Sequence, residues 1–156
     1  MEDRYLFKAK RTDNGEWIVG SLIQTPYLGS MRSWISSEQE DKARLREISS
    51  NQAVWRAFEV RTDTICQCTG LKDKNGKLIW ENDILSISKK MDSIGSYYFP
   101  PIKYPVNVFV RWDLCAWLWE TISKNKKDKY YISFPDAWCH YEAEVIGNIF
   151  EEELNG

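Results

Sequence analysis

The sequence has no apolar run that approaches the roughly 20 residues needed to span a bilayer. Its start, MEDRYLFKAK, also lacks the apolar region of a secretory signal. No phosphate-binding glycine pattern is present, since no G-x-x-x-x-G-K-[ST] occurs and no G-x-G-x-x-G follows a strand. These absences predict a cytoplasmic protein without membrane association, and they give no support for a nucleotide or any other cofactor.

Cysteine and histidine are both scarce. The cysteines are Cys66, Cys68, Cys115 and Cys139, and the only histidine is His140. A zinc site of three cysteines and this histidine can be drawn, but zinc sites usually carry C-x2–4-C pairs, and Cys66-x-Cys68 is shorter. Reduced cysteines are among the most buried residue types, so we expect buried thiols and no metal. No nucleophile motif accompanies His140, so we expect no catalysis there.

The sequence also lacks a large excess of charge of either sign. The chain has 21 basic and 23 acidic side chains and a net charge of −2, which argues against a general DNA-coating protein. Its 156 residues suit one domain, 1–156, that buries its own core. Aromatic residues make up 14% of the chain and include eight tryptophans, which favours strands with half-buried faces.

Alternating apolar and polar residues predict a first hairpin over residues 4–23, with its turn at Asp13-Asn14-Gly15. Pro26 and Gly29 are expected to end the strand that follows the turn. The polar stretch 25–52 then predicts an insertion between sheet elements, not a domain boundary.

Within this insertion a short helix or a mobile polar segment is expected near residues 36–50. Ser37 and Glu40 fit a helix capping box, and Leu45 and Ile48 form the only good apolar pair at helical spacing. Two apolar side chains bury little surface, so both alternatives stay open.

The clearest turn signal is Asn75-Gly76, in the middle of residues 64–84. It predicts a hairpin with a two-residue type I′ turn, which needs positive φ at both residues. Gly70 predicts a bulge or a close approach of two backbones. A second bulge is expected at Gly147-Asn148 in the last strand. We interpret one set of residues as structural turn residues that set strand register: Gly70, Asn75, Gly76, Asp83 and Gly147.

Further alternating segments follow at 106–114, 115–122 and 130–134, and the last covers AEVIGNIF. Strands joined by short turns predict a mainly β, single-domain fold of about eight strands, which forms a curled antiparallel sheet or a small β-barrel.

Three segments resemble the YopX proteins of phages and prophages. Residues 64–84, TICQCTGLKDKNGKLIWENDI, are similar to the family's T-V-x-Q-[YF]-T-G-L-K-D-K-N-G-K-x-I-[YF]-E-G-D-I. Gly15–Leu22 is similar to G-x-W-V-x-G-S-L, and Glu144–Glu151 to E-V-I-G-N-I-[YF]-E. Asn82 replaces a glycine of this pattern, and Cys68 replaces an aromatic residue. The resemblance implies a mainly β fold and an origin in a bacterial mobile element, and it implies no particular activity.

Three carboxylates, Asp73, Glu81 and Asp83, lie around the central hairpin. They are candidates for an acid and base pair or for a site that binds a hard metal ion. The other interpretation is that Asp73 and Asp83 bond to backbone amides in turns, as aspartate often does. This second interpretation predicts a role in stability.

A candidate nucleic-acid surface mixes cations with flat rings, which can neutralise phosphates and stack bases. Its residues are Arg111, Trp117, Trp119, Lys124, Lys126, Lys127, Lys129, Tyr130 and Tyr131. The alternative is that the tryptophans belong to the core, since Trp117 and Trp119 share a strand face, and that the lysines form a solvated hairpin tip.

The loop 91–105 carries the other candidate surface, with Tyr97, Tyr98 and Phe99 at its centre. Aromatic residues are enriched at protein interfaces. We therefore expect a non-enzymatic β-domain that binds a protein partner or a second copy of itself, and the alternative is a nucleic-acid-binding module built on residues 111–131.

Overall fold

The computed structural model describes residues 5–37, 57–89, 106–113, 116–122, 131–133 and 141–151. The described residues are mainly β, as the alternating pattern predicted. Contacts divide the chain into two compact units, Met1–Cys68 and Thr69–Gly156, while the single-domain assignment stays a prediction. No helix in the described ranges has the length and apolar character needed to cross a membrane.

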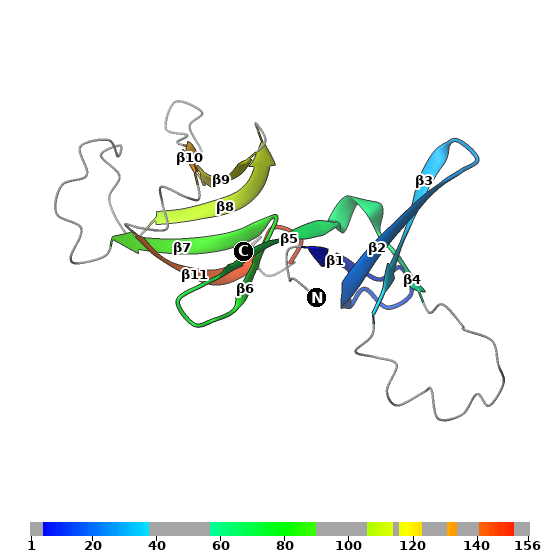
Figure 1. Ribbon diagram of the computed structural model, residues 1–156, viewed down its shortest axis with the longest axis horizontal. Helices are drawn as coiled ribbons and strands as arrows, with labels where there is room; N and C mark the ends of the chain where they lie inside the picture. Colours follow the sequence, from blue (N-terminus) through cyan, green and yellow to red (C-terminus); the bar gives the residue numbers. More distant parts are fainter. Residues whose placement is uncertain are drawn as a thin grey trace, which may run out of the picture. The chain divides into compact units, whose positions relative to one another are not determined.

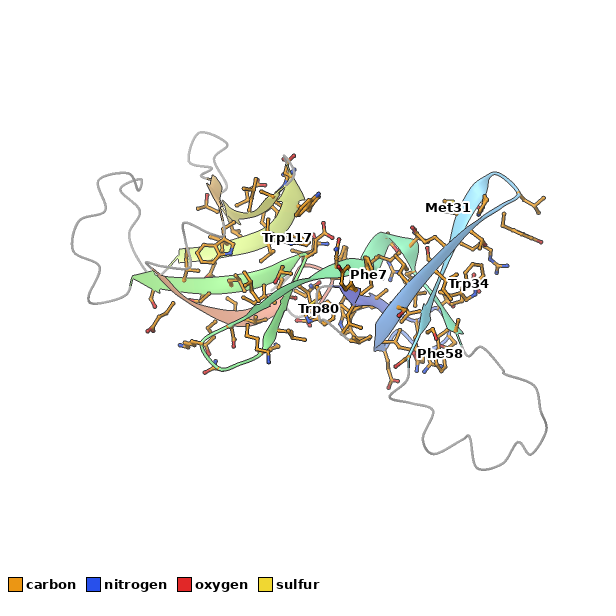
Figure 2. All side chains as sticks on the ribbon, in the orientation of Figure 1. Phe7, Met31, Trp34, Phe58, Trp80 and Trp117 are labelled. Atoms are coloured by element: carbon orange, nitrogen blue, oxygen red, sulfur yellow. The ribbon has the colours of Figure 1, made fainter. Side chains whose placement is uncertain are left out.

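The first unit is an antiparallel sheet with strand order β4-β3-β2-β1-β5 (Figure 1). Its elements are β1 (Phe7–Lys10), β2 (Trp17–Tyr27), β3 (Ser30–Ser36), β4 (Ala57–Val60), the 3-10 turn η2 (Thr62–Thr64) and the start of β5 (Cys66–Lys72). The predicted first hairpin is present and pairs Ala9 with Ile18. These two residues form a buried cluster with Ile35 and Val60, against which Phe7 and Phe58 pack (Figure 2).

The expected strand break at Pro26 and Gly29 is wrong. β2 continues through Pro26 to Tyr27, and the chain returns at once as β3. Tyr27 pairs with Ser30 next to the turn, so the following pair, Pro26 with Met31, is one that exchanges no backbone hydrogen bonds. Proline therefore costs this ladder nothing. The helix or mobile segment expected near 36–50 lies outside the described residues, apart from Ser36, which ends β3, and Ser37.

The turn between β2 and β3 consists of Leu28 and Gly29, whose φ angles are +45° and +82°. Positive φ at both positions of a two-residue hairpin loop is the signature of a type I′ turn. Leucine is unusual there, because its Cβ crowds the backbone in the left-handed region at a cost of about 1–2 kcal/mol.

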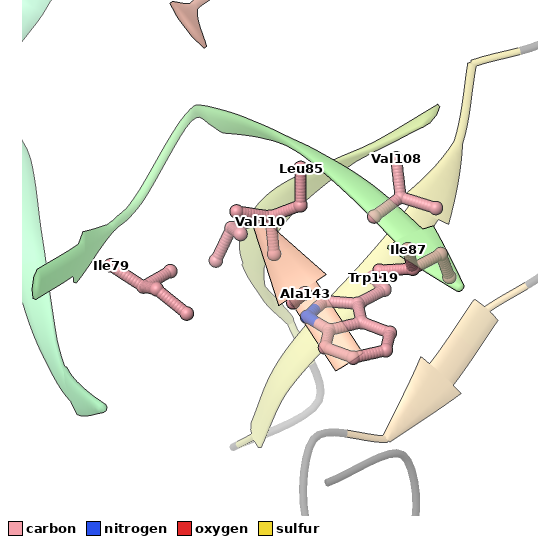
Figure 3. Close-up of a cluster of buried hydrophobic side chains, with 7 residues drawn as sticks. All are labelled: Ile79, Leu85, Ile87, Val108, Val110, Trp119 and Ala143. Carbon is pink, nitrogen blue, oxygen red and sulfur yellow. The ribbon is translucent and has the colours of Figure 1, made fainter. Parts of the chain in front are cut away.

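The second unit contains the rest of β5, which pairs with β6 (Leu78–Trp80), and a five-stranded antiparallel sheet of order β10-β9-β8-β7-β11. The sheet is built from β7 (Asp83–Lys89), β8 (Val106–Asp113), β9 (Ala116–Thr121), β10 (Tyr131–Ser133) and β11 (Tyr141–Asn148). Its inner face buries one apolar cluster, in which the indole of Trp119 is the largest side chain (Figure 3). The cluster consists of Ile79, Leu85, Ile87, Val108, Val110, Trp119 and Ala143.

Neither sheet closes on itself within the described residues, because each strand order has two distinct ends. The fold is therefore the curled antiparallel arrangement and not the small barrel that was its alternative. The sequence also predicted about eight strands, whereas the described residues form eleven. The strand that the sequence missed is β3, which lies in the stretch 25–52 where an insertion was predicted.

The packing of β2 against β3 predicts that Gly20 tolerates no side chain. A Cβ at this position would overlap the main-chain carbonyl oxygen of Ser36. We expect Gly20→Ala to lower the free energy of unfolding by about 1–3 kcal/mol in urea denaturation, as overpacked sites do. Ser21→Ala is the matched control, because Ser21 is exposed, and it should change stability by less than about 0.5 kcal/mol. Equal stability of the two variants would contradict this close approach.

Candidate functional site

The loop of the central hairpin is held by the side chain of Asp73. The amide N–H of Asp73 donates to the carbonyl of Lys77 at 2.8 Å, which leaves a three-residue loop between them. The Oδ1 atom of Asp73 accepts the amides of Asn75 at 2.8 Å and Lys77 at 2.9 Å. Gly76 takes a φ of +82°, whereas Asn75 has no positive φ. The two-residue type I′ turn predicted at Asn75-Gly76 is therefore wrong, because the aspartate carboxylate favours a longer loop with glycine alone in the left-handed region.

The other oxygen of Asp73 reaches the last strand. Oδ2 accepts the amide of Val145 at 3.0 Å, and beside it the amide of Lys74 donates to the carbonyl of Ala143 at 2.9 Å. The Lys74 Nζ atom also pairs with Glu144 Oε2 at 2.6 Å on the surface. The carboxylate of Asp73 thus joins the hairpin loop to β11, 72 residues away in the sequence.

Three amide donors hold Asp73 in its charged form. Burial by itself raises the pKa of this carboxyl, but hydrogen bonds from the amides of Val145, Lys77 and Asn75 outweigh burial and lower the pKa below its ordinary 3.8. The group is therefore a poor proton donor or acceptor at neutral pH, and all three bonds stabilise the native loop.

A second carboxylate, Asp83, connects β7 to the end of β11. Its Oδ2 accepts the amide of Trp80 at 2.8 Å, and its Oδ1 accepts Nδ2 of Asn148 at 2.9 Å. Asp83 and Asn148 each expose only 1% of their surface. Asn82, just before Asp83, has a φ of +64° and accepts the amide of Ile149 at 3.0 Å. Asparagine therefore provides the left-handed conformation at the position where the family pattern has glycine.

The glycines of the predicted turn set lie at irregular backbone positions. Gly70 in β5 has a φ of +78°. The register of β11 against β7 shifts between Val145 and Gly147, which places a bulge one residue before the expected Gly147-Asn148. The shift leaves Ile146 as the additional residue of the bulge.

The carboxylates thus bond mainly to backbone amides, in the manner of turn residues. Glu81, the third member of the candidate cluster, lies between Trp80 and Asn82 and is half-buried. The described residues contain no group of three or more histidine, cysteine or acidic side chains that could hold a metal ion. Cys66 and Cys68 are both buried thiols, while Cys139 and His140 lie outside the described residues.

Of the candidate nucleic-acid surface, the side chains of Arg111, Trp117 and Trp119 are described, and Tyr131 is described only as the first residue of β10. Trp119 is fully buried in the core of the second unit. Trp117 packs against the same core and meets Trp112 edge to face, with ring centroids 5.0 Å apart (Figure 2). The guanidinium of Arg111 donates to Glu120 at 2.9 Å and Asp113 at 2.8 Å, so two carboxylates offset its charge.

Some predicted binding residues lie outside the described residues, and their roles stay predictions. They are Tyr97, Tyr98 and Phe99 in the loop 91–105, and Lys124, Lys126 and Lys127 after β9.

The structure adds a surface that the sequence interpretation missed, because the sequence predicts an insertion over residues 25–52. β1 pairs with β2 only as far as Gly20, and β4 pairs with β3 only from Ser33. The residues between these limits continue as a two-stranded ribbon (Figure 1). We call residues 23–32 the hairpin arm. Its large exposed apolar side chains are Ile23, Tyr27, Leu28 and Met31, and Leu28 at the tip is 90% exposed.

Arg32 of the arm lies close to two aromatic rings, those of Tyr27 in the arm and Trp34 just beyond it. The guanidinium of Arg32 lies 5.2 Å from the ring centroid of Tyr27 and 5.7 Å from that of Trp34. Arg32 also pairs with Glu59 at 2.8 Å, so its charge is offset within the first unit. Tyrosine, tryptophan and arginine are the residue types that dominate binding energy at protein interfaces.

The chain matches the family model described as YopX protein over residues 6–154. The chain belongs to the YopX family. No curated protein and no solved structure matched the chain. The structure shows what the YopX-like segments do locally: Asp73, Asn82 and Asp83 belong to the central segment, and they bond to Val145, Asn148 and Ile149 of the closing segment.

The bonds of Asp73 predict a stability that depends on pH. The pKa of Asp73 is lower in the native state than its ordinary 3.8. Its contribution to stability is therefore complete above pH 3.8 and is lost as the pH falls through the native-state pKa. In Asp73→Asn, the amide Nδ2 cannot accept the Val145 N–H. We expect the free energy of unfolding in urea to fall by about 1–3 kcal/mol at neutral pH. The difference in this free energy between the variant and the unmodified chain should become smaller at acidic pH.

Lys74→Ala is the control for this prediction, since it removes the exposed pair with Glu144 from the same loop. It should cost less than about 1 kcal/mol at neutral pH. If the difference in free energy of unfolding between Asp73→Asn and the unmodified chain stays constant down to acidic pH, the role given to the charged carboxylate is contradicted.

Proposed function

We propose that this YopX-family chain is a non-enzymatic protein-binding domain and that the hairpin arm is its contact surface. The observation that supports the proposal is the exposure of Tyr27, Leu28 and Met31 together at the end of one ribbon. Exposed apolar side chains gathered in one place mark interaction sites more often than scattered ones do. The candidate carboxylates, in contrast, are bonded within the fold.

The charges of the first unit favour a protein over a nucleic acid as the partner. No charged side chain occurs between Leu22 and Met31. The arginines of the described first unit each pair with a carboxylate: Arg11 with Asp13, Arg32 with Glu59 and Arg61 with Asp63. Phosphate recognition relies on cations that are available to the backbone of the nucleic acid, and the arm offers none beyond the paired Arg32.

Site-specific photo-cross-linking in the cells that naturally make the protein tests this function. A benzophenone side chain in place of Tyr27 lies on the arm, and the same group in place of Glu16 lies on the exposed β1–β2 turn of the same unit. We expect a discrete protein adduct from position 27 and none from position 16. The captured protein, once identified and purified, should bind the intact chain and should bind a Tyr27→Ser variant more weakly.

An adduct at position 27 that nuclease removes would support the nucleic-acid alternative instead. Adducts of equal yield from both positions, or no adduct from position 27, would contradict the arm as a protein-contact surface.

A further inference from the structure

We propose that Leu28 is the anchor of the hairpin arm and that it inserts into an uncharged apolar pocket of a different protein. The inference rests on the function proposed above and adds the anchor residue and the chemistry of the partner's site. Three features of the arm carry it: the backbone at its tip, the chemistry of its edge and the distribution of charge.

The backbone at the tip is unfavourable for leucine. Leu28 has a φ of +45° and precedes Gly29, which has a φ of +82°. Both positions of such a loop favour asparagine, aspartate and glycine, which tolerate the left-handed region. Leu28 is also 90% exposed, so its side chain gains almost no burial in the described fold. Leucine therefore costs the fold backbone energy and gains no burial in return, and a contact with another molecule would supply that burial.

The β2 edge of the arm favours docking through side chains and not through addition of a strand. Pro26 occupies the part of β2 that lies beyond its pairing with β1, and its nitrogen has no hydrogen to donate outward. Strand addition needs a run of free backbone donors and acceptors. On the β2 edge the side chains at the tip are the means of contact, with Tyr27 and Met31 on either side of Leu28 in the chain.

The absence of charge defines the partner's pocket. Leu22 to Met31 contains no charged residue, and Arg32 is paired with Glu59. A charged pocket would lose hydration against this surface and gain no ion pair in return. An anionic lipid surface is also a poor match, since such surfaces attract peripheral segments through unpaired basic residues. An uncharged apolar pocket in a protein fits the arm on both counts.

The test compares Leu28→Asn with Leu28→Met in the full chain. Asparagine suits the left-handed turn but is not apolar, whereas methionine keeps both the apolar side chain and the backbone cost. We expect Leu28→Asn to unfold at a higher Tm than the unmodified chain and to bind the protein captured through position 27 roughly tenfold to a hundredfold more weakly. Leu28→Met should keep the original Tm and bind within about threefold.

The outcomes separate this inference from the proposed function. Full binding by Leu28→Asn together with weak binding by Tyr27→Ser would overturn the anchor and keep the arm as the contact surface. Full binding by both variants, or failure to capture any protein, would overturn both proposals. A lower Tm for Leu28→Asn would show that Leu28 serves folding.

Two further measurements test the identity of the occupant. In sedimentation experiments, the purified chain and the Leu28→Asn variant should show the same state of association. Vesicles of phosphatidylcholine and phosphatidylglycerol should not bind the chain in a manner that depends on Leu28. A positive result in either measurement would assign Leu28 to a second copy of the chain or to a lipid surface, and would overturn the inference.

Discussion

The described part of the second unit depends on hydrogen bonds that two aspartates accept from the last strand. Asp73 and Asp83 are both buried, and their partners Val145 and Asn148 lie 72 and 65 residues further along the chain. Contacts between such distant residues are costly in chain entropy, so strong and directional bonds are needed to specify them. A buried acceptor that loses its donor costs more than the bond is worth on average. The two carboxylates therefore fix the register of β11 as well as its attachment.

This constraint decides which residues are left for function. The YopX-like segments contain buried carboxylate and amide side chains that could in principle serve a site. Asp73, Asp83 and Asn148 instead form hydrogen bonds that hold the hairpin and β11. The hairpin arm shows the opposite balance. Its only charged side chain is Arg32, and its end pairs with no described strand beyond its own partner. The backbone at its tip has a conformation that disfavours a leucine such as Leu28.

The sequence predicted those features that depend on residues close together in the chain. Alternation placed Val108 and Val110 on the buried face of β8, and a glycine next to an asparagine placed a bulge within one residue of its position in β11. The left-handed turn at Asn82 could be expected because asparagine is the best substitute for glycine there.

Features set by distant residues could not be predicted in this way. The loop at Asn75-Gly76 is longer than its dipeptide indicates because the Asp73 carboxylate bonds within the loop and to β11 at the same time. A type I′ turn does occur, but at Leu28-Gly29, where the pairing of β2 with β3 imposes it on a leucine. Pro26 alone predicts a strand break, yet it lies within β2 in a pair without backbone hydrogen bonds. That place follows from the register, which the residue type does not reveal.

A double-mutant cycle between Asp83 and Asn148 tests most directly whether these polar residues hold the last strand. The free energy of unfolding is measured for the unmodified chain, Asp83→Ala, Asn148→Ala and the double variant. The account predicts a coupling energy of about 1–3 kcal/mol, because the bond between the two side chains is short and buried. Additive effects of the two substitutions, within about 0.5 kcal/mol, would contradict it.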